Sequence, residues 1–270
     1  MSAPDLTPAL GGTVTAFSVG SATLIAERAG SGSGERAGSA EGAGSAEGAE
    51  PAVFLLLHGL GMGRSVFVEL ARRLDGVVVA VDLPGFGAAP EPDVPLTMPE
   101  HADLVAAYLS AEGLPAVTVV GHSMGSQVAT ELAVRHPDRV RAVVLAAPTV
   151  DAGARRVALQ ALRFLHDTAS IDPRVVLRGV REYLRAGPQL VRKIRATVAH
   201  RPEELYPRIA VPALVLRGTR DPVCPSVWTR AVAEAIPQAE LAEIPGCGHE
   251  TMIRDAAPAA ARIADFLSRT

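Results

Sequence analysis

Residues 119–129 read VVGHSMGSQVA and join a predicted strand to a predicted helix. An apolar run typical of a buried strand stops at Gly121, and a helix-like stretch begins at Met124. Ser123 lies at the junction, between Gly121 and Gly125, in a G-x-S-x-G pattern. Small glycines let a strand turn sharply into a helix, and the amides that begin the helix favour a nearby negative charge. The stretch therefore predicts that Ser123 is displayed as a nucleophile at the carboxyl end of a strand.

The same change from apolar run to helix-like stretch recurs along the chain. Residues 13–28 are expected to form a hairpin, with Gly20 and Ser21 near its turn. Because strands then alternate with helices, the pattern predicts an α/β fold with a mostly parallel sheet of the eight-stranded type and helices on both faces. The later strands are expected within 52–59, 77–85, 116–123, 140–148, 212–221 and 239–246, and helices within 65–74, 98–112 (after an N-cap at Thr97), 124–136, 226–236 and 256–268.

Residues 151–208 interrupt this alternation because they contain no convincing strand. We expect them to form a helical cap over the carboxyl ends of the strands, inserted into a core made of residues 1–150 and 209–270. The apolar residues fit three helical faces, formed by Leu159, Leu162 and Leu165, by Val176, Leu177, Val180 and Leu184, and by Leu190, Val191, Ile194 and Val198.

The expected cap is also basic, with twelve basic and six acidic residues in a chain of net charge −3. A basic cap could steer an anionic substrate or an acidic carrier protein, with Arg192, Lys193 and Arg195 among the residues responsible. A solvated helical face in an arginine-rich sequence is the alternative explanation, and it is the one we favour.

Residues 30–50 differ in composition from the rest of the chain. They contain AGSAEG twice in tandem, at 37–42 and 43–48. Such a composition buries too little apolar surface to offset the entropy of ordering the chain. We expect a flexible low-complexity loop within the core domain.

A serine hydroxyl is a poor nucleophile unless a base removes its proton. His249, in IPGCGHE, follows the last predicted strand, and Asp221, in GTRDPVCP, follows the strand before it. Both therefore lie at the same edge of the sheet as Ser123, and serine, aspartate and histidine occur in the chain order expected for this architecture. We expect His249 to act as the base and Asp221 to orient it, with Asp151 as the alternative acid.

An oxyanion that forms at Ser123 also needs hydrogen-bond donors. The first buried strand ends in LLLHGLGMG, and one donor is expected from this loop while the other follows the nucleophile. The backbone N–H groups of Leu60 and Met124 are therefore the candidates.

The overall composition excludes several classes of protein. Twenty-six basic against 29 acidic residues argue against nucleic acid as a partner, and the apolar runs are far shorter than the roughly 20 residues of a membrane helix. The N-terminus resembles no secretory signal, so we expect a cytoplasmic protein. Cys224 and Cys247 are expected to be free thiols, with a redox clamp as the alternative. Neither a metal-ligand spacing nor a phosphate-binding glycine loop occurs, so no metal or cofactor is expected.

The motifs HGLG, DLPGFG, GHSMGS, RGTRDPVCP and GCGH occur in the order and spacing of the α/β-hydrolase superfamily. The chain resembles capped members of the esterase, lactonase and C–C hydrolase group over about residues 13–268. The resemblance implies a triad of Ser123, His249 and Asp221. Members with an aspartate nucleophile, such as haloalkane dehalogenases and epoxide hydrolases, do not fit because this chain has Ser123.

Three functional hypotheses follow from these residues. The first is a serine hydrolase that cleaves a carboxylic ester or lactone, with a small-molecule substrate that has an apolar acyl or alcohol part. The second is hydrolysis of a C–C bond or a thioester by the same residues. The third is a hydrolase-like binding protein or receptor with little turnover. The fold alone does not choose among them.

Overall fold

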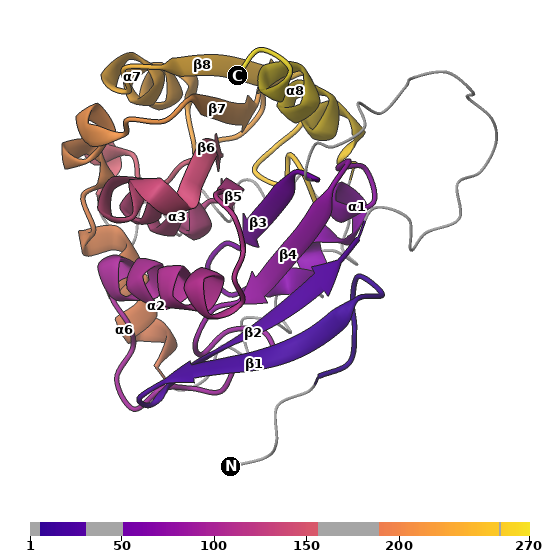
Figure 1. Ribbon diagram of the computed structural model, residues 1–270. Helices are drawn as coiled ribbons and strands as arrows, with labels where there is room; N and C mark the ends of the chain where they lie inside the picture. Colours follow the sequence, from indigo (N-terminus) through magenta and orange to yellow (C-terminus); the bar gives the residue numbers. More distant parts are fainter. Residues whose placement is uncertain (1–5, 31–50, 156–188, 254) are drawn as a thin grey trace, which may run out of the picture.

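The computed structural model describes residues 6–30, 51–155, 189–253 and 255–270. In this part of the chain eight strands form one sheet, in the order β1-β2-β4-β3-β5-β6-β7-β8 (Figure 1). β1 pairs antiparallel with β2, and β2 pairs antiparallel with β4, whereas the remaining pairs are parallel. The prediction of a mostly parallel eight-stranded sheet is confirmed. The strands span Thr13–Val19 (β1), Ala22–Ala29 (β2), Val53–Leu57 (β3), Val77–Asp82 (β4), Val117–His122 (β5), Val140–Ala146 (β6), Ala213–Gly218 (β7) and Ala239–Ile244 (β8).

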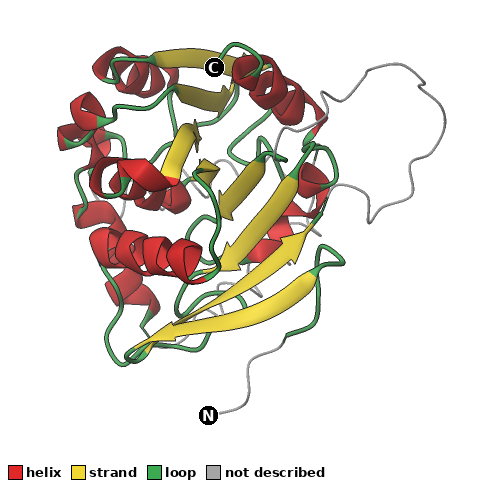
Figure 2. Cartoon of the chain, viewed as in Figure 1, coloured by secondary structure: helices red, strands yellow, loops and turns green. Residues whose placement is uncertain are grey.

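Helices cover both faces of the sheet (Figure 2), as the sequence predicts. One layer consists of α2 (Met98–Ala111), α3 (Met124–Arg135) and α7 (Ser226–Ala235), which share one apolar core with the sheet. The opposite layer contains α1 (Val68–Ala71) and α8 (Ala257–Leu267), which pack in a second core. With helices on both sides, every residue of β3, β5 and β7 is buried, which explains their continuous apolar runs.

The start of α2 follows its predicted N-cap. The Thr97 hydroxyl accepts a hydrogen bond from the Glu100 backbone N–H, and the Glu100 carboxylate accepts one from the Thr97 backbone N–H. This capping box satisfies two donors at the helix start, and it fixes where the buried face of α2 begins.

The helix expected over residues 65–74 is shorter than predicted. A 3₁₀ turn, η1 (Arg64–Phe67), leads into the single turn of α1. Arg64 is buried at this point because its guanidinium pairs with Glu27 and with Asp82. These contacts between distant parts of the chain, rather than helical periodicity, therefore hold the start of the segment.

The segment between β6 and β7 contains α6 (Leu190–Ala199) and the 3₁₀ turns η3 (Ala152–Ala154), η4 (Pro202–Glu204) and η5 (Tyr206–Arg208). A further 3₁₀ turn, η2 (Pro137–Arg139), precedes β6. The expected helical faces at 159–165 and 176–184 lie outside the described residues, as does most of the low-complexity loop at 30–50.

The face expected for the third helix is wrong in part. α6 buries Lys193 and Thr197, while Val191 is 59% exposed. The apolar pattern predicted the wrong inner face because a charged residue, Lys193, occupies it. Its ammonium group is compensated by Glu91 and by the Gly85 carbonyl.

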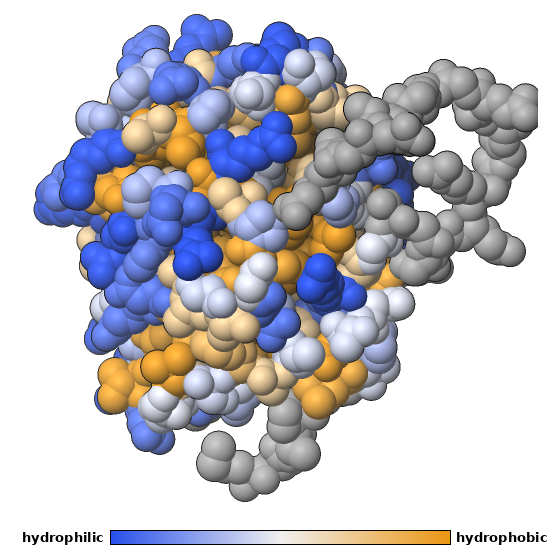
Figure 3. Space-filling view, viewed as in Figure 1, coloured by the Kyte–Doolittle hydropathy of each residue, from blue (hydrophilic) through white to orange (hydrophobic). Residues whose placement is uncertain are grey.

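Within the described residues, no helix combines the length and the apolar character that crossing a membrane requires. On the face seen in Figure 3, hydrophilic residues in blue are interspersed with hydrophobic residues in orange.

Candidate functional site

Three predicted site residues meet at the carboxyl edge of the sheet. Ser123 follows β5, Asp221 follows β7 and His249 follows β8. His249 Nε2 lies 3.0 Å from Ser123 Oγ, and His249 Nδ1 lies 2.8 Å from Asp221 Oδ2. His249 and Asp221 are 4% and 3% exposed, so the ion-pairing side of the imidazole is shielded from water. This arrangement aligns a hydroxyl, a base and a carboxylate in one hydrogen-bonded row.

The backbone of the strand-to-helix turn holds Ser123 in an unusual conformation, with φ 53° and ψ −115°. Positive φ is uncommon for a residue other than glycine, and such conformations concentrate at functional sites. Tight packing beneath the turn stabilises it, because a Cβ at Gly125 would overlap the Leu57 carbonyl oxygen and one at Gly121 would overlap the Gly125 carbonyl. The two glycines of the motif are therefore required by packing against β3 and within the turn itself.

The carboxylate of Asp221 is held from two directions. The backbone N–H groups of Val223 and Cys224 donate to Oδ1, which leaves Oδ2 for His249. Burial alone would raise the pKa of Asp221, but the neighbouring His249 and these amides outweigh it, and the pKa lies below its usual value. An ionised carboxylate accepts hydrogen bonds only, so His249 Nδ1 carries the proton and Nε2 is left to accept from Ser123.

The loop that carries His249 packs tightly over the end of β7. A Cβ at Gly218 would overlap the carbonyl oxygens of Cys247 and Gly248, so glycine permits this approach. His122, just before the serine, braces the same loop, since its Nε2 lies 2.9 Å from the His249 backbone oxygen and the two rings lie 5.2 Å apart. Complete burial, followed by the nearby His249, lowers the pKa of His122 to about 4. The neutral ring therefore donates to the backbone of His249 and stays uncharged near neutral pH.

The loop after β3 lies beside the serine. His58 Nε2 accepts from the Leu83 backbone N–H, and a Cβ at Gly59 would come within 3.2 Å of Ser123 Cβ. Within the described residues, no hydrogen bond is found from the backbone N–H of Leu60, and Met124 begins α3, where the helix offers its N–H no acceptor. Neither predicted oxyanion donor therefore has a hydrogen-bond acceptor among the described residues.

Asp151, the alternative acid, lies at the start of η3. Its carboxylate accepts from the Gly153 backbone N–H and caps η3, whereas His249 contacts Asp221. Within the described residues, neither Cys224 nor Cys247 forms a disulfide. Among the described residues, no group of three or more His, Cys, Asp or Glu side chains is arranged to hold a metal ion.

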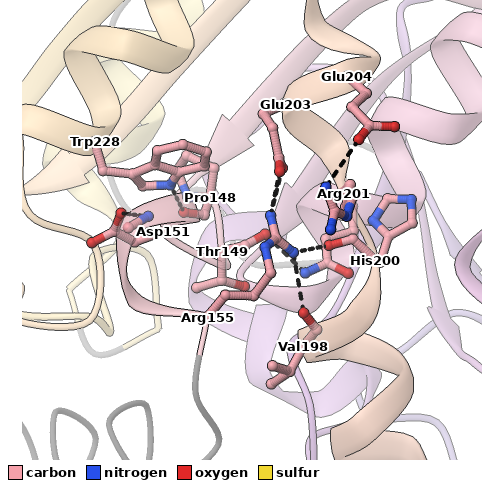
Figure 4. A network of polar contacts seen from close by, with 12 residues as sticks. Pro148, Thr149, Asp151, Arg155, Val198, His200, Arg201, Glu203, Glu204 and Trp228 are labelled. Atoms are coloured by element: carbon pink, nitrogen blue, oxygen red, sulfur yellow. Dashed lines mark hydrogen bonds and ion pairs between the residues drawn. The ribbon is translucent and has the colours of Figure 1, made fainter.

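Figure 4 shows how the end of α6 is attached to the start of the segment between β6 and β7. The Arg155 guanidinium donates to the carbonyl oxygens of Val198 and His200 and pairs with Glu203 at 2.6 Å. The carbonyls at a helix C-terminus lack partners within the helix, so one arginine satisfies two of them. Arg155 thereby joins the two ends of the segment expected to form a cap.

α6 also rests on the nucleophile helix and on the loop after β4. Gln127 of α3 donates to the carbonyl oxygens of Thr149 and Thr197. Lys193 Nζ lies 2.5 Å from the Gly85 carbonyl, 2.7 Å from Glu91 Oε2 and 4.5 Å from the Phe86 ring centroid. Because the charge of Lys193 is compensated by Glu91, it does not supply the exposed steering charge that the sequence suggested.

The sequence did not single out His101, although the side chain is buried. It lies on the inner face of α2 and lines a small pocket with Lys193 and Met124. A histidine within the apolar pattern of residues 98–112 was the available signal, because an ionisable side chain in a buried helical face calls for a specific reason.

Three comparisons with known proteins show which family the chain belongs to. A model of the alpha/beta hydrolase family matches residues 54–263. The chain is 30% identical over 224 residues to a pimeloyl-[acyl-carrier protein] methyl ester esterase of Chromobacterium violaceum, covering 72% of this chain and 86% of that protein. It is 28% identical over 245 residues to a 2-hydroxymuconate semialdehyde hydrolase of Pseudomonas sp. (strain CF600), covering 79% and 86%.

Among solved structures, a thermophilic esterase from Thermogutta terrifontis (malate bound) superposes with a TM-score of 0.72 at 25% identity, covering 92% of this chain and 94% of the esterase. The family match extends from β3 to α8 and includes Ser123, Asp221 and His249. The chain therefore belongs to the alpha/beta hydrolase family, and it is a hydrolase.

Proposed function

We propose that the protein cleaves carboxylic esters or lactones through an acyl-enzyme intermediate, with Ser123 as nucleophile, His249 as base and Asp221 as the orienting acid. The observation that carries this proposal is the row of contacts from Ser123 Oγ through both nitrogens of His249 to Asp221, at 3.0 and 2.8 Å. Similarity to a methyl ester esterase over 86% of that protein's length supports the choice of an ester.

The proton route follows from the hydrogen bonds. His249 Nε2 takes the proton of Ser123 as Oγ attacks the carbonyl carbon, and the resulting imidazolium is stabilised by the buried Asp221 carboxylate. The same nitrogen then protonates the departing alcohol. In deacylation His249 removes a proton from water, which attacks the acyl carbon and releases the acid and Ser123.

The tetrahedral oxyanion would be held by the N–H groups of Leu60 and Met124. In support, the loop after β3 that carries Leu60 approaches Ser123 at Gly59, and Met124 directly follows Ser123 at the start of α3. Residues 151–208 would form the cap that closes over this edge, anchored through Arg155, Gln127 and Lys193. A substrate is then enclosed between the cap and the strand ends.

The decisive experiment is turnover of p-nitrophenyl esters of increasing acyl length by wild type and by Ser123→Ala. The variant should retain its circular dichroism spectrum and lose at least about 10³-fold in kcat. Ser268→Ala, at the end of α8, is the matched control and should keep wild-type activity. Full activity in Ser123→Ala would reject the assignment.

Similarity to 2-hydroxymuconate semialdehyde hydrolase over 79% of this chain favours a second candidate, hydrolysis of a C–C bond by the same residues. A panel of esters, thioesters and vinylogous diketones would rank these activities by kcat/KM. Covalent labelling of Ser123 by a fluorophosphonate without turnover of any of them would instead favour a receptor.

A further inference from the structure

Arg217 is a charged residue in the interior of the sheet. It lies on β7, the strand that leads into the loop of Asp221, and its side chain is 6% exposed. Its register partner on β8 is Glu243, and the Arg217 guanidinium lies 2.7 Å from Glu243 Oε1. A buried charge is costly unless it is paired and hydrogen-bonded, so the other contacts of this guanidinium indicate why a charge is placed here.

The Arg217 guanidinium also donates to two backbone carbonyls that flank Asp221. Nε lies 3.1 Å from the Cys224 carbonyl oxygen, and Nη2 lies 3.3 Å from the Thr219 carbonyl oxygen. Thr219 precedes Asp221 in the chain, and Cys224 follows it. The planar guanidinium presents its donors in a fixed fork, so one side chain holds both ends of the Asp221 loop.

Cys224 is bound through both its carbonyl and its amide. The carbonyl accepts from Arg217, and the backbone N–H donates to Asp221 Oδ1 at 2.9 Å. The other carboxylate oxygen, Oδ2, lies 2.8 Å from His249 Nδ1. Because the amide and the carbonyl belong to one residue, displacement of the Cys224 carbonyl would also move the amide that orients the Asp221 carboxylate towards the imidazole.

Thr219 joins the Asp221 loop to the loop that carries His249. Its hydroxyl accepts a hydrogen bond from the Gly246 backbone N–H at 2.9 Å. Glu243, the charged partner of Arg217, lies on β8, from which the His249 loop departs. The Arg217 guanidinium is therefore placed to fix the position of Asp221 relative to His249.

We propose that Arg217 is a positioning residue of the hydrolase, which acts through Asp221 by holding its loop in the conformation that orients His249. This role rests on the proposed function, because it adds Arg217 to the machinery proposed for Ser123, His249 and Asp221. A displacement of about 1 Å in a catalytic group can cost on the order of 10²-fold in rate, so the loss of Arg217 should appear in kcat.

A double-mutant cycle separates positioning from general stabilisation. Arg217→Met removes the hydrogen bonds and the charge, and it should lower kcat for a p-nitrophenyl ester by about 10- to 100-fold with KM within a few-fold of wild type. In Asp221→Asn, where the carboxylate is already lost, adding Arg217→Met should lower kcat by less than about threefold, because effects of residues that act as a unit are not additive. Equal losses in the two backgrounds, or no loss in wild type, would overturn the positioning role.

Arg217→Lys separates the fork from the charge. It keeps a cation beside Glu243 but cannot reach both carbonyls, so its loss in kcat should be close to that of Arg217→Met, and wild-type kcat would contradict the role. If Arg217→Met does not give a folded circular dichroism spectrum, the cycle with Arg217→Lys decides by the same outcomes.

Two control variants should keep kcat within a few-fold of wild type. Arg269→Met removes another arginine that pairs with a glutamate of β8, Glu240, at 2.6 Å. Val215→Ala removes methyl groups from the buried part of β7, so it should lower stability in urea unfolding without the loss in kcat.

The rate at which a fluorophosphonate labels Ser123 gives a readout that does not depend on the substrate. Arg217→Met should slow labelling in the wild-type background by about tenfold or more and by less than about threefold in Asp221→Asn. If labelling follows this cycle but no ester is hydrolysed, the proposed ester hydrolysis fails and the role of Arg217 stands. If ester hydrolysis depends on Ser123 but the cycle is additive, the proposed function stands and the role of Arg217 fails.

Discussion

Replacing His122 by asparagine should change how the stability of the protein depends on pH. His122 is fully buried, and burial together with the neighbouring His249 lowers its pKa from about 6.5 to about 4. Asparagine cannot be protonated but can still donate a hydrogen bond to the His249 backbone oxygen, as His122 Nε2 does at 2.9 Å. The substitution therefore removes a titration while keeping the brace.

The size of the effect on the free energy of unfolding follows from proton linkage. Between pH 6.5 and 4 the unfolded chain binds a proton at this residue and the native protein does not, so the free energy of unfolding falls as the pH is lowered through that window. One such proton contributes a slope of about 1.4 kcal/mol per pH unit, or on the order of 3 kcal/mol over the whole window. Above pH 6.5 the stabilisation is fully present.

Urea unfolding followed by Trp228 fluorescence at intervals between pH 7 and 4.5 would measure this slope. His122→Asn should give a shallower curve than wild type, by up to about 1.4 kcal/mol per pH unit. Val120→Ala, in the same buried strand, is the control because it removes methyl groups and no titratable group. Its free energy of unfolding should be lower than that of wild type at every pH, and its curve against pH should run parallel to the wild-type curve. If the His122→Asn curve is also parallel, burial does not keep His122 neutral and the reasoning fails.

Three further substitutions test other parts of the site. Asp221→Asn should lower kcat on the order of 10³-fold with little change in KM, whereas Asp151→Asn should stay within a few-fold of wild type; steady-state kinetics on one ester distinguish the two acids. Gly125→Ala should destabilise the fold by at least about 2 kcal/mol in urea unfolding, because the added Cβ overlaps the Leu57 carbonyl, and unchanged stability would contradict the packing argument. Arg155→Ala should lower stability by roughly 1–3 kcal/mol in the same assay, and Arg155→Lys should not restore it because one ammonium cannot replace the forked contacts.

The sheet could be predicted because its signals are local. Continuous apolar runs such as 53–57 arise from burial on both faces, and each is followed by a helix with its own start signal, such as Thr97 before α2. The approach of Ser123, Asp221 and His249 was also foreseeable, since parallel strands bring their carboxyl ends to one edge and the chain order is that of the family.

Other features depend on contacts between distant residues, and periodicity does not record these. The burial of Lys193 on α6 needs Glu91, about a hundred residues earlier, and the short η1 turn needs Glu27 and Asp82 around Arg64. None of these three partners can be identified from one sequence alone. The small pocket that His101 lines could not be predicted for a related reason, because a pocket is a property of several elements packed together.

The backbone angles of Ser123 restrict which chemistry evolution or an engineer could install at this position. Threonine carries the same hydroxyl, yet its branched β-carbon is poorly tolerated at φ 53°, so the exchange would disturb the turn. Cysteine has an unbranched β-carbon and fits the same geometry. The backbone conformation at this position, more than the acidity of the reacting group, therefore decides which residue could replace Ser123 as the nucleophile. Cysteine could do so, and threonine could not.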